Sequence, residues 1–269
     1  MHKENEDKKA LKKAKQEERK QYFFVIRELT SREIKRKYSR SYLGVIWSVL
    51  NPLLMMSVLS MIFTQLFSRS IENYPIYYLS GYTTWQLFTS ATNAAMTTLV
   101  DNRTMLIKVR FPMQVFILAR IYTALVNFGY SMIAYVVMLV VFRIVPSITI
   151  LYFPLIVLFV MLFSIGLSFI LATAYVFFGD VKHLYSVITT VWLYCSAIFY
   201  PVDQITGFAR TVIEINPLFQ YINATRNVVM YGVWPSLLET VVMAAWALVM
   251  LEAGYLVFSL NKNKIMQKI

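Results

Sequence analysis

Four basic side chains stand just before the first long apolar stretch of this sequence, and their type and spacing suit them to bind phosphate. They are Lys35, Arg36, Lys37 and Arg40. Apolar or aromatic residues recur at every fourth position between them, which predicts that residues 22–44 form an amphipathic helix in the headgroup region of a membrane. Cations at that depth attract anionic headgroups, so we expect these four to guide a phosphorylated lipid. A simple membrane anchor would have the same pattern, and both interpretations stay open.

Two further charges, Arg120 and Glu252, interrupt apolar segments. Each lies roughly 12 Å from the end of its segment at 1.5 Å per residue, and the two segments are expected to run in opposite directions. Because a charge inside a bilayer is costly without a partner, we expect an ion pair between these two side chains. The alternative is that Arg120 holds a lipid phosphate or extends to the interface.

The sequence lacks the motifs of nucleotide binding, hydrolase catalysis, disulfide bonding and metal binding. The eight glycines are too widely spaced for a P-loop, a dinucleotide-binding loop or a nucleophile elbow, so the chain itself is not expected to be an enzyme or to bind ATP. The single Cys195 excludes an internal disulfide, and His2 and His183 alone give no metal site. A transport subunit, a channel or a membrane scaffold remains.

The elements that position these residues are predicted to be membrane helices. Hydrophobic residues make up 58% of the chain and charged residues 15%, which would expose too much apolar surface for a soluble domain. Although the net charge is +12, the basic residues crowd before Gly44 and into short loops, which favours an anionic lipid surface over nucleic acid. The fold class is therefore an all-α integral membrane protein.

Six stretches are long and apolar enough to cross a bilayer. They are Val45 to Phe67 with a kink expected at Pro52, Ile76 to Val100, a stretch after Pro112 that ends near Phe142, Ile150 to Gly179, Leu184 to Tyr200, and Thr240 to Leu260. Between the last two, Asp203 to Pro235 is expected to form short re-entrant helices. Basic residues concentrate on the side of both termini, which the positive-inside rule places in the cytoplasm.

This topology divides the chain into four regions. Residues 1–21 form a charged cytoplasmic tail, expected to be disordered or a solvated helix, and residues 22–44 the amphipathic helix. Thr30 and Glu33 match a capping box, which predicts a helix start near Thr30 inside that segment. Residues 45–260 form the six-span domain and 261–269 a cytoplasmic C-terminal tail. Between spans two and three, Asp101 or Asn102 is expected to cap a short basic helix that ends before Pro112.

Aromatic side chains gather in the outer halves of spans two and five. Sugars stack on such rings, which favours a glycan path, yet an aromatic belt at a membrane interface needs no substrate. Both interpretations remain for the group, which comprises Tyr82, Trp85, Phe88, Trp192, Tyr194, Phe199 and Tyr200.

Several short motifs carry a family resemblance. They are Arg27-Glu28-Leu29 through Lys37-Tyr38, Ser41 to Trp47 with Asn51-Pro52-Leu53, Lys108 to Pro112, Phe177-Phe178-Gly179-Asp180-Val181, and Asn216-Pro217. From about Tyr22 to the C-terminus the chain resembles the permease subunits of ATP-binding-cassette exporters of lipid-linked O-antigen, teichoic acid and other surface polysaccharides. The family often has Arg where Gly179 stands here, so any role of that Arg is lost.

The resemblance implies a permease homodimer in a bacterial plasma membrane with two ATPase subunits, which bind ATP and magnesium, on its cytoplasmic face. The two cytoplasmic loops between spans would then couple ATPase motion to the membrane domain, rather than being plain solvated turns. The coupling residues expected there are Asp101, Asn102, Arg103, Met105, Lys108, Arg110, Asp180, Lys182 and His183. The exported molecule would be a polyprenyl-linked glycan. A drug exporter of the same superfamily is the alternative, and a non-transporting scaffold comes third.

Overall fold

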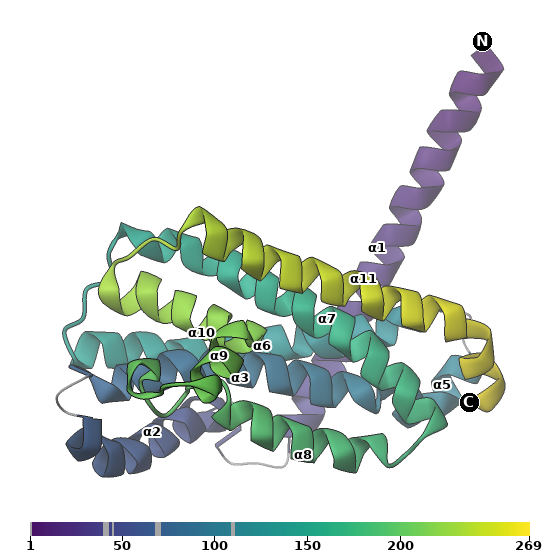
Figure 1. The fold of residues 1–269 in the computed structure, drawn as a ribbon. Helices are drawn as coiled ribbons and strands as arrows, with labels where there is room; N and C mark the ends of the chain where they lie inside the picture. The colour runs from purple at the N-terminus through teal and green to yellow at the C-terminus, as the bar shows by residue number, and fades with distance from the viewer. Residues whose placement is uncertain (1, 40–42, 45, 68–70, 109–110) are drawn as a thin grey trace.

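The computed structural model describes residues 2–39, 43–44, 46–67, 71–108 and 111–269, and the described chain is a bundle of long helices (Figure 1). The first helix, α1 (His2–Tyr38), packs against the bundle with its C-terminal part and projects away from it with its N-terminal part. Lys, Glu, Gln and Ala dominate its first half, and these residues favour helix. The first part of the chain, up to residue 21, is therefore helical from His2 and continuous with the rest of α1.

The predicted helix start near Thr30 is wrong, because α1 passes through this position without a break. The Thr30 hydroxyl does not cap a helix but donates a hydrogen bond to the carbonyl oxygen of Ala119 at 3.2 Å, and it accepts one from the Thr123 hydroxyl at 3.2 Å. Thr30 thus fastens α1 to another helix of the bundle.

Four segments are long and apolar enough to cross a membrane among the residues described. They are Ile46–Gln65 of α2 (Ile46–Phe67), Gln114–Val141, which is α6, Ile148–Phe177, which joins η1 (Ile148–Tyr152) to α7 (Phe153–Phe177), and Leu237–Lys268, which is α11. They correspond to predicted spans one, three, four and six. The last helix continues through the predicted 261–269 tail, and α2 continues through Pro52.

Predicted spans two and five differ from the observed helices. The second becomes α3 (Tyr74–Met96), which ends before Val100 and is followed by the single turn of α4 (Thr98–Asp101). The fifth becomes α8 (Val181–Tyr194), which has 14 residues and is shorter than the predicted Leu184 to Tyr200. At 1.5 Å per residue, α8 covers about 21 Å, less than the ~30 Å of a hydrocarbon core.

Short helices do follow α8. They are η2 (Val202–Gln204), α9 (Phe208–Ile215), α10 (Pro217–Arg226) and the π-helical turn η3 (Asn227–Tyr231). Pro217 occupies the first turn of α10, where its missing N–H costs nothing. This helix is deeply buried and packs against α3, α7 and α11.

Helix α3 lies inside the bundle. It packs against α2, α6, α7 and α10, and most of its residues are buried, including polar Ser80, Thr83, Thr84 and Thr92. The hydroxyls of these four donate to main-chain oxygens within the same helix. A helix this polar is therefore shielded from lipid by its apolar neighbours.

Helices α7 and α11 approach each other at two glycines. A Cβ atom added at Gly166 would lie 2.1 Å from the carbonyl oxygen of Met250, and one added at Gly254 would lie 2.0 Å from the carbonyl oxygen of Gly166. The two backbones are in direct contact here, which only residues without a Cβ allow. No other glycine lies within four residues of either one, so the sequence has no Gly-x-x-x-Gly pattern that would predict this contact.

Replacing Gly166 by Ala should destabilise the protein, since the added methyl group overlaps the Met250 backbone; overpacking of this kind costs about 1–3 kcal/mol or more. The matched control is Gly129→Ala in α6, where a Cβ atom meets nothing within 4 Å. Thermal unfolding in detergent, followed by fluorescence-detected size exclusion, should show a lower melting temperature for G166A only. Equal melting temperatures for both variants would contradict the close approach.

Candidate functional site

An ion pair joins α1 to α6. The Arg120 Nη1 and Glu33 Oε2 atoms are 2.5 Å apart, and both side chains are only 16% exposed. The Arg120 Nε also donates to the Thr98 hydroxyl at 3.3 Å, which connects the pair to α4. The predicted pair between Arg120 and Glu252 is therefore wrong: Glu33 on α1 neutralises Arg120, while Glu252 lies exposed on α11.

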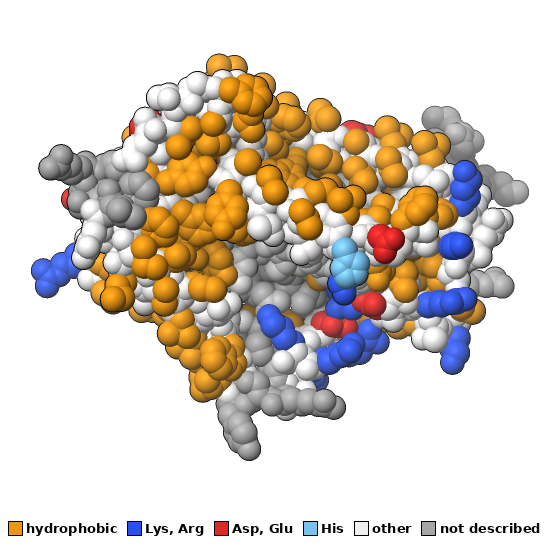
Figure 2. Space-filling model, turned by 60° about the horizontal axis from the view of Figure 1, so that its bottom comes forward, with side chains coloured by type: hydrophobic (Ala, Val, Ile, Leu, Met, Phe, Trp, Pro, Cys, Tyr) orange, Lys and Arg blue, Asp and Glu red, His pale blue; other side chains and the backbone are white. Residues whose placement is uncertain are grey.

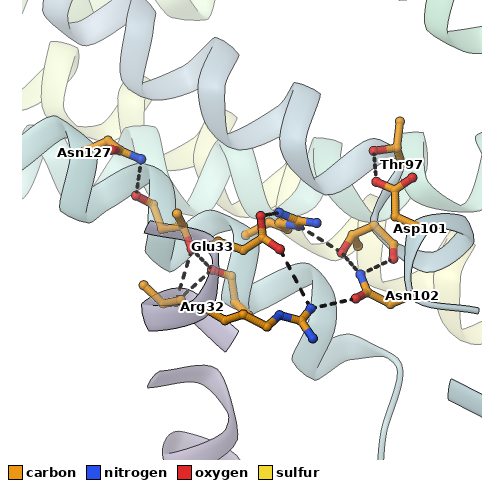
Figure 3. A network of polar contacts seen from close by, with 11 residues as sticks. Arg32, Glu33, Thr97, Asp101, Asn102 and Asn127 are labelled. Atoms are coloured by element: carbon orange, nitrogen blue, oxygen red, sulfur yellow. Dashed lines mark hydrogen bonds and ion pairs between the residues drawn. The ribbon is translucent and has the colours of Figure 1, made fainter. Parts of the chain in front are cut away.

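A second contact joins α1 to the loop after α4, beside the ion pair (Figure 3). The Arg32 Nη2 atom donates to the Asn102 Oδ1 atom at 3.1 Å, and Arg32 also lies 3.8 Å from Glu33. The Asn102 amide in turn donates to the Thr98 carbonyl oxygen at 2.8 Å. One continuous polar network thus connects α1, α4 and α6.

The short basic helix predicted after span two is present as α5 (Arg103–Lys108), but its expected side-chain cap is not. The Asp101 carboxylate accepts a hydrogen bond from Thr97 at 2.7 Å instead, and Asn102 contributes its backbone oxygen to the first turn of α5. Leu106 anchors α5 in the core, Met105 is half-buried, and Arg103 and Lys108 are exposed. Arg110 lies outside the described residues.

The turn between α7 and α8 is the second predicted coupling segment. Asp180, Lys182 and His183 are all exposed, and the backbone oxygen of Asp180 accepts hydrogen bonds from the N–H groups of His183 and Leu184 at the start of α8. In Figure 1 this turn lies at the same end of the bundle as α5 and the C-terminus. The structure thus brings the two predicted coupling segments to one end of the molecule.

The basic residues predicted to guide a lipid phosphate come at the C-terminal end of α1. Lys35, Arg36 and Lys37 are exposed, whereas Arg40 lies outside the described residues. Lys37 Nζ donates to Asn127 Oδ1 of α6 at 3.5 Å. Figure 2 shows charged side chains gathered mainly near one end of the bundle, with a broad hydrophobic surface beside them.

The predicted glycan-lining aromatics mostly form core. Phe88 has no exposed surface and packs edge-on against Trp192 with ring centroids 5.3 Å apart, and Trp85 is 6% exposed. These two rings cannot touch a glycan in this conformation, so the expectation fails for them. Tyr82 stacks on Tyr78 and is half-buried.

The end of α8 carries the remaining aromatic candidates. Tyr194 is exposed and packs its ring near Phe199, and the Tyr200 hydroxyl donates to the Tyr194 carbonyl oxygen at 2.5 Å. Of the seven predicted aromatics, Tyr194 is the one that is largely exposed.

Asn216 explains the Asn-Pro motif. Its Oδ1 atom accepts hydrogen bonds from the Leu218 N–H at 3.0 Å and from the Trp192 indole at 2.8 Å, and its amide donates to the Cys195 carbonyl oxygen at 2.9 Å. One side chain thus caps α10 and closes the end of α8. The sequence reveals the cap but not these distant partners.

Arg226 is a buried cation at the end of α10, within the segment predicted to form short re-entrant helices. Its two terminal nitrogens donate to the carbonyl oxygens of Ala197 and Ile198 at 3.0 and 3.1 Å, and its guanidinium carbon lies 3.5 Å from the ring centroid of Tyr77. Arg226 thereby gives hydrogen-bond partners to two backbone carbonyl oxygens in the non-helical turn after α8. A Cβ atom at Gly81 would lie 2.7 Å from Arg226, so this glycine leaves room for the guanidinium.

Comparison with known proteins connects this geometry to a family. The family model described as ABC-2 type transporter matches residues 25–230. The chain belongs to the ABC-2 type transporter family. It is also 29% identical to the O-antigen export system permease protein RfbA of Myxococcus xanthus over 251 residues, which cover 93% of this chain and 96% of the relative. It is 30% identical to a protein of the same name from Klebsiella pneumoniae over 211 residues, covering 78% and 82%.

Membership makes this chain a membrane transport subunit of an ABC transporter, which implies an ATPase partner. The matched region begins within α1 and ends in η3, so it includes the Glu33–Arg120 pair and both predicted coupling segments. The polar network therefore lies between α1 and the α4–α5 segment that was predicted to meet the ATPase.

Replacing Arg120 by Gln should destabilise the permease by about 1–3 kcal/mol, because the half-buried Glu33 carboxylate would lose its nearest cation. The double variant Glu33→Gln with Arg120→Gln should recover part of that loss, since no unpaired charge remains. Melting temperatures in detergent measure both effects.

The control is Arg210→Gln, which breaks the exposed Arg210–Glu214 pair of α9, and little change is expected there. A double variant as unstable as the sum of its two single variants would contradict the assigned pair.

Proposed function

We propose that this ABC-2 permease exports a surface polysaccharide linked to a polyprenyl lipid across the bacterial plasma membrane. The observation that carries the proposal is similarity over 93% and 78% of the chain to two permeases named for O-antigen export. The exposed basic residues at the end of α1 support it, since they would attract a lipid phosphate at the interface. A small apolar drug would need no such guide.

The proposed topology has six crossings with both termini in the cytoplasm. Helix α3 has 23 residues and would reach about 35 Å, enough to cross, and its polar surface is enclosed by neighbouring helices. Helix α8 would complete its crossing with the turn after Cys195, whose carbonyl oxygens Asn216 and Arg226 satisfy. Non-helical backbone at membrane depth is tolerated where protein satisfies it in this way.

The proposed assembly is a homodimer of permeases with two ATPase subunits. Helix α2 exposes large apolar side chains over much of its length, and Tyr185 is the one buried side chain of α8. Lipid or a second permease would cover these faces. A second copy would account for the large apolar surface that α2 and α8 each leave uncovered by their own chain.

The ATPase would dock on α5 and on the turn between α7 and α8. Movement of α5 would reach α1 through the Arg32–Asn102 contact and α6 through Thr98 and Arg120. Helix α1, which carries Lys35, Arg36 and Lys37, would therefore move together with α5, which would receive the ATPase. Tyr194 is the aromatic side chain best exposed to meet the glycan during export.

Cysteines placed at Thr104 and Lys182 should cross-link to the ATPase subunit, because both positions are exposed at the proposed docking end. Met105 and Val181, beside them, are half-buried and react less readily. The background is Cys195→Ser, and immunoblotting after treatment with a bismaleimide measures the product. Val145 at the opposite end, 89% exposed, is the control. Products from Val145 but not from Thr104 or Lys182 would refute this docking surface.

Deleting the gene should remove surface polysaccharide and leave lipid-linked polymer inside the cell, measured by immunoblotting of cell-surface extracts. Replacing Lys35, Arg36 and Lys37 together by Gln should reproduce part of that loss, since three cations would leave the interface. The matched control replaces Lys262, Lys264 and Lys268 at the end of α11 by Gln. Intact surface glycan after deletion, with new sensitivity to amphiphilic antibiotics, would replace the proposal with a drug exporter.

A further inference from the structure

A cavity of about 450 Å³ lies between the short helices that follow α8 and the start of α11. Its walls come from η2, α9, α10 and the first two turns of α11. The start of α11 lies at the end of the bundle opposite α5 and the C-terminus (Figure 1), so the cavity is remote from both coupling segments. Small-molecule pockets measure about 300–1,000 Å³, and this cavity is therefore large enough to hold a ligand.

The charged side chains of this cavity carry both signs. The carboxylates of Asp203, Glu214 and Glu239 line it together with one cation, Arg210. Glu214 Oε1 accepts a hydrogen bond from Arg210 Nε at 2.7 Å, which leaves the terminal nitrogens of the guanidinium for a further anion. No group of three metal-ligating side chains is close enough to hold a metal ion in the described part of the chain. The cavity thus suits a ligand that itself carries a cationic and an anionic group.

The excess of carboxylates selects for an ammonium group and against a ligand with a net negative charge. Three carboxylates face one guanidinium, so an anionic lipid headgroup is repelled. A primary ammonium group carries several N–H donors, and its hydrogen bonds to carboxylates are the strong, charge-assisted kind. Glu239 is prepared to accept one of them, because Ser236 N–H occupies only its Oε2 atom, at 2.7 Å, and leaves Oε1.

The apolar wall of the cavity continues onto the exposed surface of α11. Leu238 and Val242 line the cavity, and Ala245 and Val249 extend the same helix face at i+7 and i+11. All four are exposed or half-buried, in a helix that is apolar enough to cross a membrane. An acyl chain can therefore lie along α11 while its headgroup is held in the cavity.

Helix α9 and the residues before α11 place the cavity at the level of lipid headgroups. Phe208, Val212 and Ile215 recur at i, i+4 and i+7 of α9 and are 84%, 41% and 59% exposed, while the two charged residues of α9 line the cavity from its other face. A helix with these two faces is typical of a membrane interface. Tyr231 and Trp234 are 54% and 51% exposed, and exposed Tyr and Trp are enriched at the same level.

We propose that this cavity binds the headgroup of a zwitterionic phospholipid with a primary amine, phosphatidylethanolamine, from the leaflet opposite the ATPase. The ammonium group meets Asp203 and Glu239, the phosphate meets Arg210, and an acyl chain follows Leu238 and Val242. The bound lipid connects α9 and η2 to α11 and so stabilises the segment between α8 and α11. The site goes beyond the proposed function, because it depends on the membrane insertion of α11 and not on the exported molecule.

A sugar of an exported glycan is the other ligand whose donors would suit these carboxylates. A neutral sugar offers no anion to Arg210, and it has no acyl chain to cover the apolar face that runs from Leu238 to Val249. The observations therefore favour the lipid, and the sugar is one outcome of the test.

Lipid binding to the purified permease–ATPase complex tests the site. The complex in detergent is titrated with phosphatidylethanolamine, phosphatidylcholine and phosphatidylglycerol of the same acyl chains, and bound lipid is measured by native mass spectrometry. Phosphatidylethanolamine should bind most tightly, because the methylated amine of phosphatidylcholine cannot donate hydrogen bonds and phosphatidylglycerol is an anion.

The double variant Asp203→Asn with Glu239→Gln should weaken binding of phosphatidylethanolamine about tenfold, the effect of two exposed charge contacts. The same variant should strengthen binding of phosphatidylglycerol, since less negative charge repels it. A misfolded protein would lose both lipids, so the opposite signs separate the site from a structural defect. Gln at position 239 can still accept from the Ser236 N–H, which preserves the capping box of α11.

Glu252→Gln is the matched control, because it removes the same charge from the same helix at an exposed position away from the cavity. It should change none of the three affinities. If the double variant does not fold, judged by its melting temperature without lipid, Glu239→Gln alone should weaken phosphatidylethanolamine about threefold.

Equal affinities for phosphatidylethanolamine and phosphatidylcholine in the wild type, or an unchanged affinity for phosphatidylethanolamine in the double variant, would overturn the proposal. Displacement of phosphatidylethanolamine by oligosaccharides cut from the surface polysaccharide, lost in the double variant, would assign the cavity to the glycan and overturn it as well. Deletion of the gene tests export separately, so either result removes the lipid site and leaves the export function standing.

Discussion

The inability of lipid to form hydrogen bonds is the constraint on which this structure depends. Every backbone polar group at membrane depth must find a hydrogen-bond partner within the protein. Helix α3 meets this requirement by returning its hydroxyls to its own backbone and by lying inside a ring of apolar helices. The turn after α8 meets it through Asn216 and Arg226, which come from the chain 20 or more residues later.

The same constraint explains where charge is placed. Arg120 lies within an apolar helix, and Glu33 reaches it because α1 lies along α6 near the end of the bundle. The pair thus holds α1 to α6, and Arg32 extends this attachment to the start of α5 through Asn102. The Arg120 charge would be costly in lipid, but its pair with Glu33 connects α1, which would meet the substrate, to the α4–α5 segment, which would meet the ATPase.

Hydropathy predicted four of the crossing segments, because long apolar runs have few alternatives to a membrane helix. Hydropathy could not predict where α8 ends, because that end is held by Asn216 and Arg226, which lie much later in the chain. It paired Arg120 with Glu252 by depth alone, whereas the true partner belongs to a helix expected to lie at the interface. Aromatic spacing likewise could not separate core rings such as Phe88 from exposed ones such as Tyr194, because both occur in the same predicted spans.

In the proposed topology six segments cross the membrane, and α5 and the turn after α7 lie on the cytoplasmic side. Labelling of single cysteines by a membrane-impermeant maleimide tests it most directly. Cysteines at Val145 and Phe208 should react in intact spheroplasts, and cysteines at Lys108, Lys182 and Lys264 should react only after permeabilisation. Reaction at Lys182 in intact spheroplasts, or protection of Phe208 in them, would contradict the account.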